Sequence, residues 1–184
     1  MTPAEQLKEE HQGILLMLKI LDKVAAKLAA GEKVEVRHLE RIVEFLRVFA
    51  DKCHHGKEED LLFPEMEKAG IPKEGGPIGV MLAEHEQGRG FIKGMAEALD
   101  RRVKGDPQAL PAYGENARTY IALLIQHIDK EDNILFPMGE KVLSQKTQEE
   151  LVEGLEKIEL ERIGEGAHEE FQKRLHHLQE VYLD

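Results

Sequence analysis

Hydrophobic residues recur every three or four positions along almost the whole chain, which is the spacing with which an amphipathic helix buries one face. The first such stretch opens with Thr2-Pro3-Ala4-Glu5, which has the form of a capping box with proline at the first helical position. Gly31 ends this helix. His11 lies on the same stripe as the apolar residues, which are Leu7, Ile14, Leu18, Leu21 and Leu28. No stretch alternates as a strand would, so the sequence predicts an all-α protein.

Three more helices are predicted after this one. In chain order they cover about residues 35–64, 77–104 and 107–137, and residues 70–77 form a loop. The last of these helices begins somewhere between residues 106 and 113, because two prolines in this range obscure its first residue. Pro64 is expected to kink or restart the second helix. Because four helices with short connections pack as antiparallel neighbours, residues 1–143 are predicted to form an up-down-up-down four-helix bundle.

The last part of the chain, residues 144–184, is predicted to form a C-terminal helical extension packed on or beside the bundle. Thr147-Gln148-Glu149-Glu150 has the form of a second capping box. Gly164 and Gly166 interrupt the helical pattern, so the extension holds one or two helices.

The chain carries one stretch twice. The segments 53–64 and 126–137 both end in Leu-Phe-Pro and align without a gap. Residues four apart lie on one face of a helix, so each copy offers an imidazole and a carboxylate to one point in space. A single pair of this kind is usually solvated, but two copies in register within one small domain indicate a shared site. The matched positions are His54 with His127 and Glu58 with Glu131.

Two further histidines fall at the level of these pairs. His11 lies eight residues past Pro3, and His85 lies eight residues past Pro77. At ~1.5 Å per residue, both lie roughly 12 Å from the starts of their helices. In an antiparallel bundle the ends of the even helices are level with the starts of the odd ones, so all four histidines are predicted to share one layer of the core. The pattern is that of a duplicated helical hairpin with a pseudo-twofold axis through this layer.

Four imidazoles and two carboxylates in a bundle interior would be costly unless something binds them. Two divalent ions would bring four positive charges against the two negative charges of the glutamates, and the excess invites a bridging hydroxide or oxide. A single tetrahedral zinc would use four ligands and leave two groups without a partner. The alternative is a buried, hydrogen-bonded polar layer that binds no metal.

The overall charge bounds the class of partner. The chain has 25 Lys and Arg against 36 Asp and Glu, which gives a net charge of −11. So acidic a protein repels nucleic-acid phosphates and anionic membranes and attracts cations. The sequence shows no signal peptide and no apolar run of the ~20 residues that a membrane span needs. With Cys53 as the single cysteine, it predicts a soluble cytoplasmic protein with no nucleic-acid or membrane partner.

The lone His11, the two His-x-x-x-Glu…Leu-Phe-Pro segments and Glu84-His85 resemble the hemerythrin-like (HHE cation-binding) family over about residues 3–140. The resemblance implies two non-haem irons with an oxo or hydroxo bridge, although His and Glu sites also accept manganese or zinc. The metal ligands that the resemblance implies are His11, His54, Glu58, His85, His127 and Glu131.

For function, the resemblance implies a protein that binds or reacts with a small ligand (O2, NO or peroxide) in sensing, detoxification or iron-cluster repair. An iron storage or sensing protein without catalysis is the alternative, and a purely structural bundle is a third reading. The sequence leaves open whether the protein is an enzyme, which ligand it takes and how many copies assemble.

Two positions depart from the oxygen-carrying hemerythrins that the pattern resembles. Those proteins have a second histidine one turn past the third-helix ligand, where this chain has Arg89. They also have an aspartate five residues after the last histidine, where this chain has Asp132 but also Glu131 at four. The site is therefore expected to be poorer by one histidine and more open, which favours sensing, peroxide or NO chemistry or iron handling over simple oxygen carriage.

The other histidines are assigned by their positions on the predicted helices. His38 lies early in the second helix and is predicted at the surface. His55 is one residue off the ligand face and is predicted to point sideways. His176 and His177 lie in the extension without partners and are predicted to be solvated.

Four further residues have two readings each. His168 and Glu161 are seven residues apart in the extension and are either surface residues, which the pattern favours, or extra ligands that fold back onto the metal. Tyr120 faces the same way as His127 and is either a core tyrosine, which is favoured, or part of the ligand pocket. Cys53 reads as a small core residue rather than a redox thiol.

Overall fold

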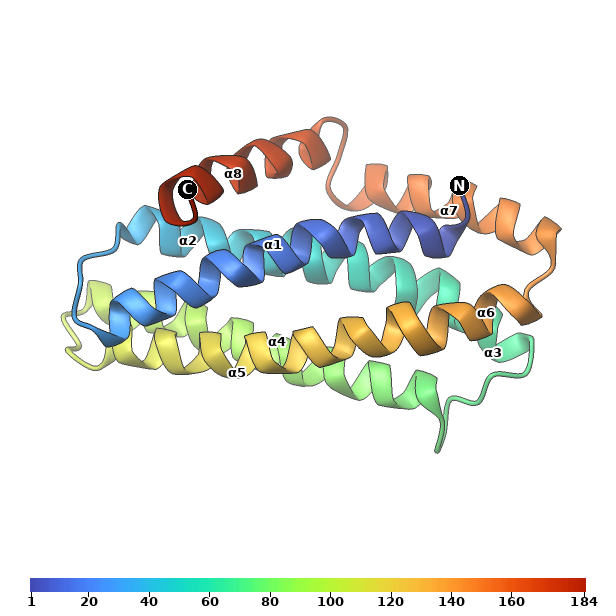
Figure 1. Cartoon of the computed structure of the whole chain (residues 1–184), viewed down its shortest axis with the longest axis horizontal. Coiled ribbons are helices and arrows are strands. Elements are labelled where there is room, and N and C mark those ends of the chain that lie inside the picture. Colours follow the sequence, from blue (N-terminus) through green and yellow to red (C-terminus); the bar gives the residue numbers. More distant parts are fainter.

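The computed structural model describes all 184 residues, and every regular element in it is helical, as the sequence predicts. The helices follow one another in long rods that lie side by side (Figure 1). The first rod is α1 (Pro3–Ala29); the second joins α2 (Val36–Glu44), η1 (Phe45–His55), η2 (Glu58–Leu62) and α3 (Phe63–Lys68); the third is α4 (Pro77–Val103); the fourth joins α5 (Ala109–Lys130), η3 (Glu131–Leu135) and α6 (Phe136–Val142). The extension consists of α7 (Gln145–Arg162) and α8 (Ala167–Tyr182).

The start of α1 has the predicted capping box. The Thr2 hydroxyl accepts from the Glu5 backbone N–H at 3.1 Å, and the Glu5 carboxylate accepts from the Thr2 N–H at 2.8 Å. Past the other end of the helix, Gly31 has a φ of 73°, which glycine adopts without strain.

The predicted capping box at Thr147 is wrong. The N-cap of α7 is Ser144, whose hydroxyl accepts from the Thr147 N–H at 3.1 Å. Ser144 has extended backbone angles, which aim its hydroxyl at the first turn, whereas Thr147 already lies inside the helix. The first helix of the extension therefore begins three residues earlier than a cap at Thr147 would place it.

Neither proline of the repeated stretch ends its rod. Directly before Pro64 and Pro137 the chain forms the π-helical turns η2 and η3, in which an N–H bonds to the carbonyl five residues back: Phe63 to Glu58, and Phe136 to Glu131. The wider turn accommodates a residue that has no N–H of its own. The fourth rod therefore continues to Val142 instead of ending at Pro137.

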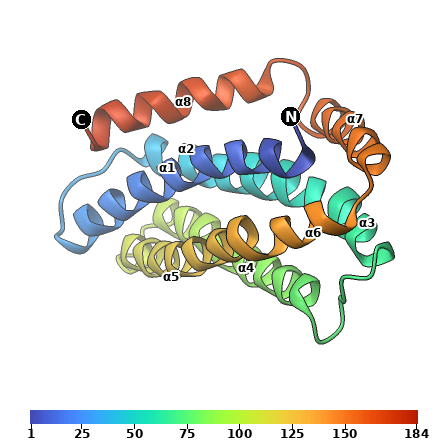
Figure 2. The same ribbon diagram turned by 45° about the vertical axis from the view of Figure 1, so that its right-hand side comes forward.

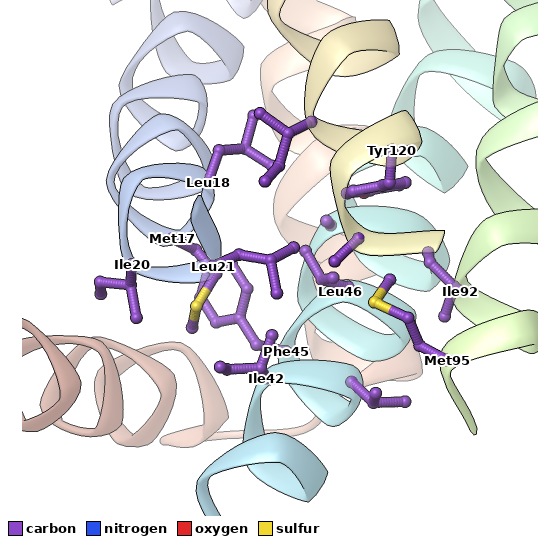
Figure 3. Packing of buried hydrophobic residues seen from close by; sticks show 14 of the residues in the cluster. Met17, Leu18, Ile20, Leu21, Ile42, Phe45, Leu46, Ile92, Met95 and Tyr120 are labelled. Carbon is purple, nitrogen blue, oxygen red and sulfur yellow. The ribbon is translucent and has the colours of Figure 1, made fainter. Parts of the chain in front are cut away.

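The interior has two apolar clusters with a polar layer between them. The larger cluster is built around Met17 and Leu21 of α1, which meet Phe45 and Leu46 of the second rod (Figure 3). The smaller cluster lies at the other end of the rods and includes Leu7. On the first three rods His11, His54 and His85 fall between the residues of one cluster and those of the other. On the fourth rod His127 comes directly before Ile128, the last residue of the larger cluster there, and Glu131 falls between the clusters. The polar layer therefore has an apolar cluster on either side.

The extension packs against the rods. Figure 2 shows α8 lying along α1, with which it is in contact. Phe171, Leu175 and Leu178 of α8 belong to the larger cluster, and Leu151 of α7 belongs to the smaller one. None of the helices combines the length and hydrophobicity that a membrane-spanning segment requires.

Changing Leu175→Ala should lower the free energy of unfolding by about 2–4 kcal/mol, because it leaves a cavity in the main core. Leu160→Ala is the control, since Leu160 is 59% exposed on α7 while Leu175 is 1% exposed; its effect should stay within about 0.5 kcal/mol. Urea unfolding followed by circular dichroism measures both. Equal small effects would mean that α8 is not part of the core.

Candidate metal centre

All six residues predicted as ligands are buried and come together in the polar layer. Two groups of four potential ligands share Glu58, and within each group the ligand atoms all lie within 4.8 Å of one another. The first group is His11, His54, Glu58 and Glu131; the second is His55, Glu58, His85 and His127. The second group contains one residue, His55, that the sequence placed elsewhere.

Each central glutamate lies between histidines of the two halves of the chain. Glu58 has one oxygen on each side, and so does Glu131. The distances are 3.1 Å from Glu58 Oε1 to His54 Nε2, 3.2 Å from Glu58 Oε2 to His85 Nε2, 2.9 Å from Glu131 Oε1 to His127 Nε2 and 3.1 Å from Glu131 Oε2 to His11 Nε2. A carboxylate with its two oxygens directed to two sides has the form of a bridge.

The central atoms are close together, but only His85 Nε2 and His127 Nε2 are within hydrogen-bond distance of each other, at 3.1 Å. All four oxygens of Glu58 and Glu131, and Nε2 of His11 and His54, are buried without a hydrogen-bond partner. Such groups cost about 1–3 kcal/mol each when left unsatisfied, so a native structure holds few of them. Lone pairs that face a common centre without donors are what a metal ion requires, and imidazole with carboxylate suits iron, manganese and zinc. The residues fit a metal site.

The outer nitrogens of the histidines are all held by carboxylates. The four contacts of the predicted ligands run from Nδ1 of His11 to Asp132 at 2.7 Å, of His54 to Glu10 at 3.0 Å, of His85 to Glu59 at 2.8 Å and of His127 to Glu84 at 3.0 Å. A carboxylate at Nδ1 fixes the proton there and turns the Nε2 lone pair inward, and this arrangement surrounds most metal-bound histidines. Asp132 therefore supports His11 rather than lying in the centre.

The charges of the site shift its pKa values strongly. Burial alone would lower the pKa of His54, but Glu58 and Glu10 outweigh burial and raise it to about 10. Burial likewise opposes the charge of His85, while Glu131, Glu58 and Glu59 raise its pKa to about 11. Burial would raise the pKa of Glu131, but His127 and His11 hold it well below the usual range. Without metal the site therefore balances its carboxylates with protons, which metal ions must displace.

The prediction for His55 is wrong. It is buried, and its ring stacks on that of His85 with centroids 3.8 Å apart and an angle of 14° between the planes. The reason is local: η1 is π-helical, so successive side chains do not follow the regular α-helical spacing that was used to assign its direction. Burial lowers the pKa of His55 well below its ordinary value, which keeps the ring neutral.

The prediction for His38 is wrong as well. It is buried because α8 covers it, and its Nδ1 lies 2.7 Å from the Tyr182 hydroxyl. His176 and His177 are exposed, as predicted. Tyr120 is a core tyrosine in the larger cluster, the reading that the sequence favours, and its hydroxyl has no hydrogen-bond partner. Burial raises the pKa of the Cys53 thiol to about 12, so Cys53 is a core residue and not a reactive thiolate.

Neither candidate ligand from the extension reaches the centre. Glu161 is exposed and faces Lys157 at 3.8 Å, whereas His168 Nδ1 contacts Glu159 at 3.1 Å. The extension is linked to the site in another way. Lys57 Nζ is buried and donates to Glu10 at 2.8 Å and to Glu159 at 3.0 Å, and Glu10 in turn holds His54.

The outer groups could have been found from the sequence repeat. Glu10 and Glu84 each precede a ligand histidine, and each bonds to the other histidine of its own half. Lys57 matches Lys130 three residues after the repeated histidine, and both contact these glutamates. The signal lies in the repeat and not in residue type, because a lysine beside a glutamate on a helix is ordinarily a surface pair.

The rods and the polar layer define a helical metal-binding protein whose ligands come from all four rods. A family model described as the hemerythrin HHE cation-binding domain matches residues 2–139, and the chain belongs to this family. The family assignment made from the motifs is thereby confirmed. The match ends just before the extension begins.

Several curated proteins are similar to this chain. It is 26% identical to the uncharacterized protein Rv1995 of Mycobacterium tuberculosis over 164 residues, which are 89% of this chain and 64% of that protein. It is 29% identical to the iron-sulfur cluster repair protein YtfE of Escherichia coli O81 over 133 residues, 71% of this chain and 58% of that one. The chain thus spans less than two thirds of these relatives. No solved structure matches it.

Replacing Lys57→Met should lower the free energy of unfolding of the metal-free protein by about 2–4 kcal/mol, because the buried carboxylate of Glu10 would lose the cation among its two partners and keep only His54. Lys130→Met removes the matching lysine of the second repeat, which is 36% exposed at its side chain, and should cost less than about 1 kcal/mol. Urea unfolding compares the two variants. Equal losses would show that burial of Lys57 and its contact with Glu159 add nothing.

Proposed function

We propose that this protein holds a non-haem di-iron centre and that a small ligand, O2, NO or peroxide, binds or reacts there. The observation that carries the proposal is the position of Glu58 and Glu131, each with one oxygen toward a histidine of either half of the chain. Two carboxylates so placed would hold two metal ions side by side. In this proposal the four rods form an up-down-up-down four-helix bundle of residues 1–143. Residues 144–184 form a helical extension that packs on this bundle.

The names of the curated relatives favour iron over other metals. Manganese and zinc also bind His and Glu, so the ligand types alone do not choose. The relatives named iron-sulfur cluster repair proteins support iron, and they support a role in iron-cluster repair. The ligands are proposed to be those predicted from the sequence: His11, His54, Glu58, His85, His127 and Glu131.

The residues of the chain would serve the centre in three ways. The outer carboxylates fix the rings and keep the inner nitrogens free for metal. The apolar clusters on both sides of the layer limit water, which strengthens every charge interaction inside. Glu58 and Glu131 offset the charge of the ions. Two bound irons would supply the redox change and a coordination position for the small ligand.

Replacing His54→Ala or Glu131→Ala should reduce iron affinity by more than about 100-fold, because even groups behind the ligands contribute about 10–100-fold. His168→Ala is the control, because it also removes one histidine from the chain, but a histidine that lies outside both ligand groups. Iron per chain after anaerobic reconstitution and dialysis measures the effect. Full iron content in the two ligand variants would contradict the site.

The function itself is tested by loading the protein with Fe(II) without air and then adding air, NO or peroxide in separate experiments. Two irons per chain and a near-ultraviolet band on oxidation, with rapid consumption of one of the three ligands, are expected. Stable iron with no consumption of any of them would support an iron store or sensor instead. One zinc, or no metal in any preparation, would overturn the di-iron proposal.

A further inference from the structure

The two halves of the chain supply equal sets of groups to the polar layer, with one exception. His54 and His127 are separated by 127 − 54 = 73 residues, and Glu58 and Glu131 by 131 − 58 = 73. The same shift relates Glu59 to Asp132, which hold the outer nitrogens of His85 and His11. Ligands and supporting carboxylates therefore obey the pseudo-twofold relation that the sequence predicts.

His55 breaks this relation. Its counterpart in the second half, at 55 + 73 = 128, is Ile128, which belongs to the larger apolar cluster. The residue behind His55 is Asp51, whose counterpart at 51 + 73 = 124 is Leu124, also a residue of that cluster. A polar pair thus stands on one side of the centre where the other side has two apolar side chains.

The geometry of His55 is that of the neighbouring ligand. Its Nδ1 lies 3.0 Å from Asp51 Oδ1, so its outer nitrogen is held as in the other four histidines of the layer. Its ring is almost parallel to that of His85. Its ligand atom lies within 4.8 Å of those of Glu58, His85 and His127.

Arg89 bonds to both of the carboxylates that hold the parallel rings of His55 and His85. Its Nε donates to Asp51 Oδ2 at 3.0 Å, and its guanidinium also bonds to Glu59, the carboxylate that holds His85. One arginine thus fixes the two carboxylates that orient His55 and His85. Arg89 stands on the third rod where the oxygen-carrying hemerythrins have a second histidine. In this chain the additional histidine is His55 of the second rod, and Arg89 bonds to the carboxylate that holds it.

We propose that His55 is a metal ligand, so that three histidines (His55, His85 and His127) serve one metal position and two (His11 and His54) serve the other. This inference rests on the proposed di-metal centre. It revises the expectation that the site is poorer by one histidine. With five histidines the centre is unequal, because one ligand group has three histidines and the other has two.

The test compares His55→Ala with His177→Ala, an exposed histidine of the extension, in the full chain loaded with Fe(II). The His55 variant should bind one of its two irons at least about tenfold more weakly, the smallest effect expected even for a group behind a ligand. Its near-ultraviolet and visible spectrum should change, and millimolar imidazole, which fits the space left by the ring, should restore both. The control should behave as the unaltered protein.

A buried histidine that only packs against His85 would give other results. Two irons with unchanged affinity and spectrum in His55→Ala would overturn the proposal, as would an affinity loss that imidazole does not reverse in a variant with unchanged circular dichroism. If His55→Ala does not fold, His55→Gln keeps a polar side chain of similar size without the ring and is judged by the same spectrum and affinity. Absence of iron from the unaltered protein would instead refute the di-iron proposal itself.

Discussion

Two carboxylates in the middle of the polar layer, Glu58 and Glu131, are 0% exposed, and the rest of the site is arranged around the cost of burying them. A buried carboxylate needs donors or cations, and here the four carboxylate oxygens have histidine nitrogens nearby but no hydrogen-bond partner. The imidazoles must approach from four rods to surround the pair. Every rod therefore interrupts its apolar stripe at one level, and two separate apolar clusters form where an ordinary bundle would have one.

The supporting carboxylates extend this constraint outward. Each histidine of the layer holds its orientation through a carboxylate that lies nearer the surface. Four of these carboxylates in turn face a basic side chain: Glu10 faces Lys57, Glu84 faces Lys130, and Asp51 and Glu59 both face Arg89. Charge thus alternates from the centre toward solvent. The extension enters this alternation through Glu159, so α7 contributes to the site although it places no ligand there.

Much of this arrangement is legible in the sequence, and the parts that are not have physical reasons. The helical spacing, the capping box at Thr2 and the level shared by His11, His54, His85 and His127 follow from local rules and from the repeat. The direction of the His55 side chain does not follow from these rules, because no side-chain pattern predicts a π-helical turn. The burial of His38 depends on Tyr182, which lies 182 − 38 = 144 residues away in the chain, and burial created by so distant a segment leaves no trace near the residue itself.

The π-helical turns have a consequence for how the second rod tolerates change in length. A π-helical turn bonds each N–H one residue further back than an α-helical turn, so it stores an additional residue within an otherwise continuous rod. Deletion of one residue in η1 can be absorbed by tightening the rod to an α-helix, with no new loop. The side chains on one side of the deletion would then rotate relative to those on the other. In η1, an insertion or deletion of one residue would therefore keep the helix but change which side chains face the interior.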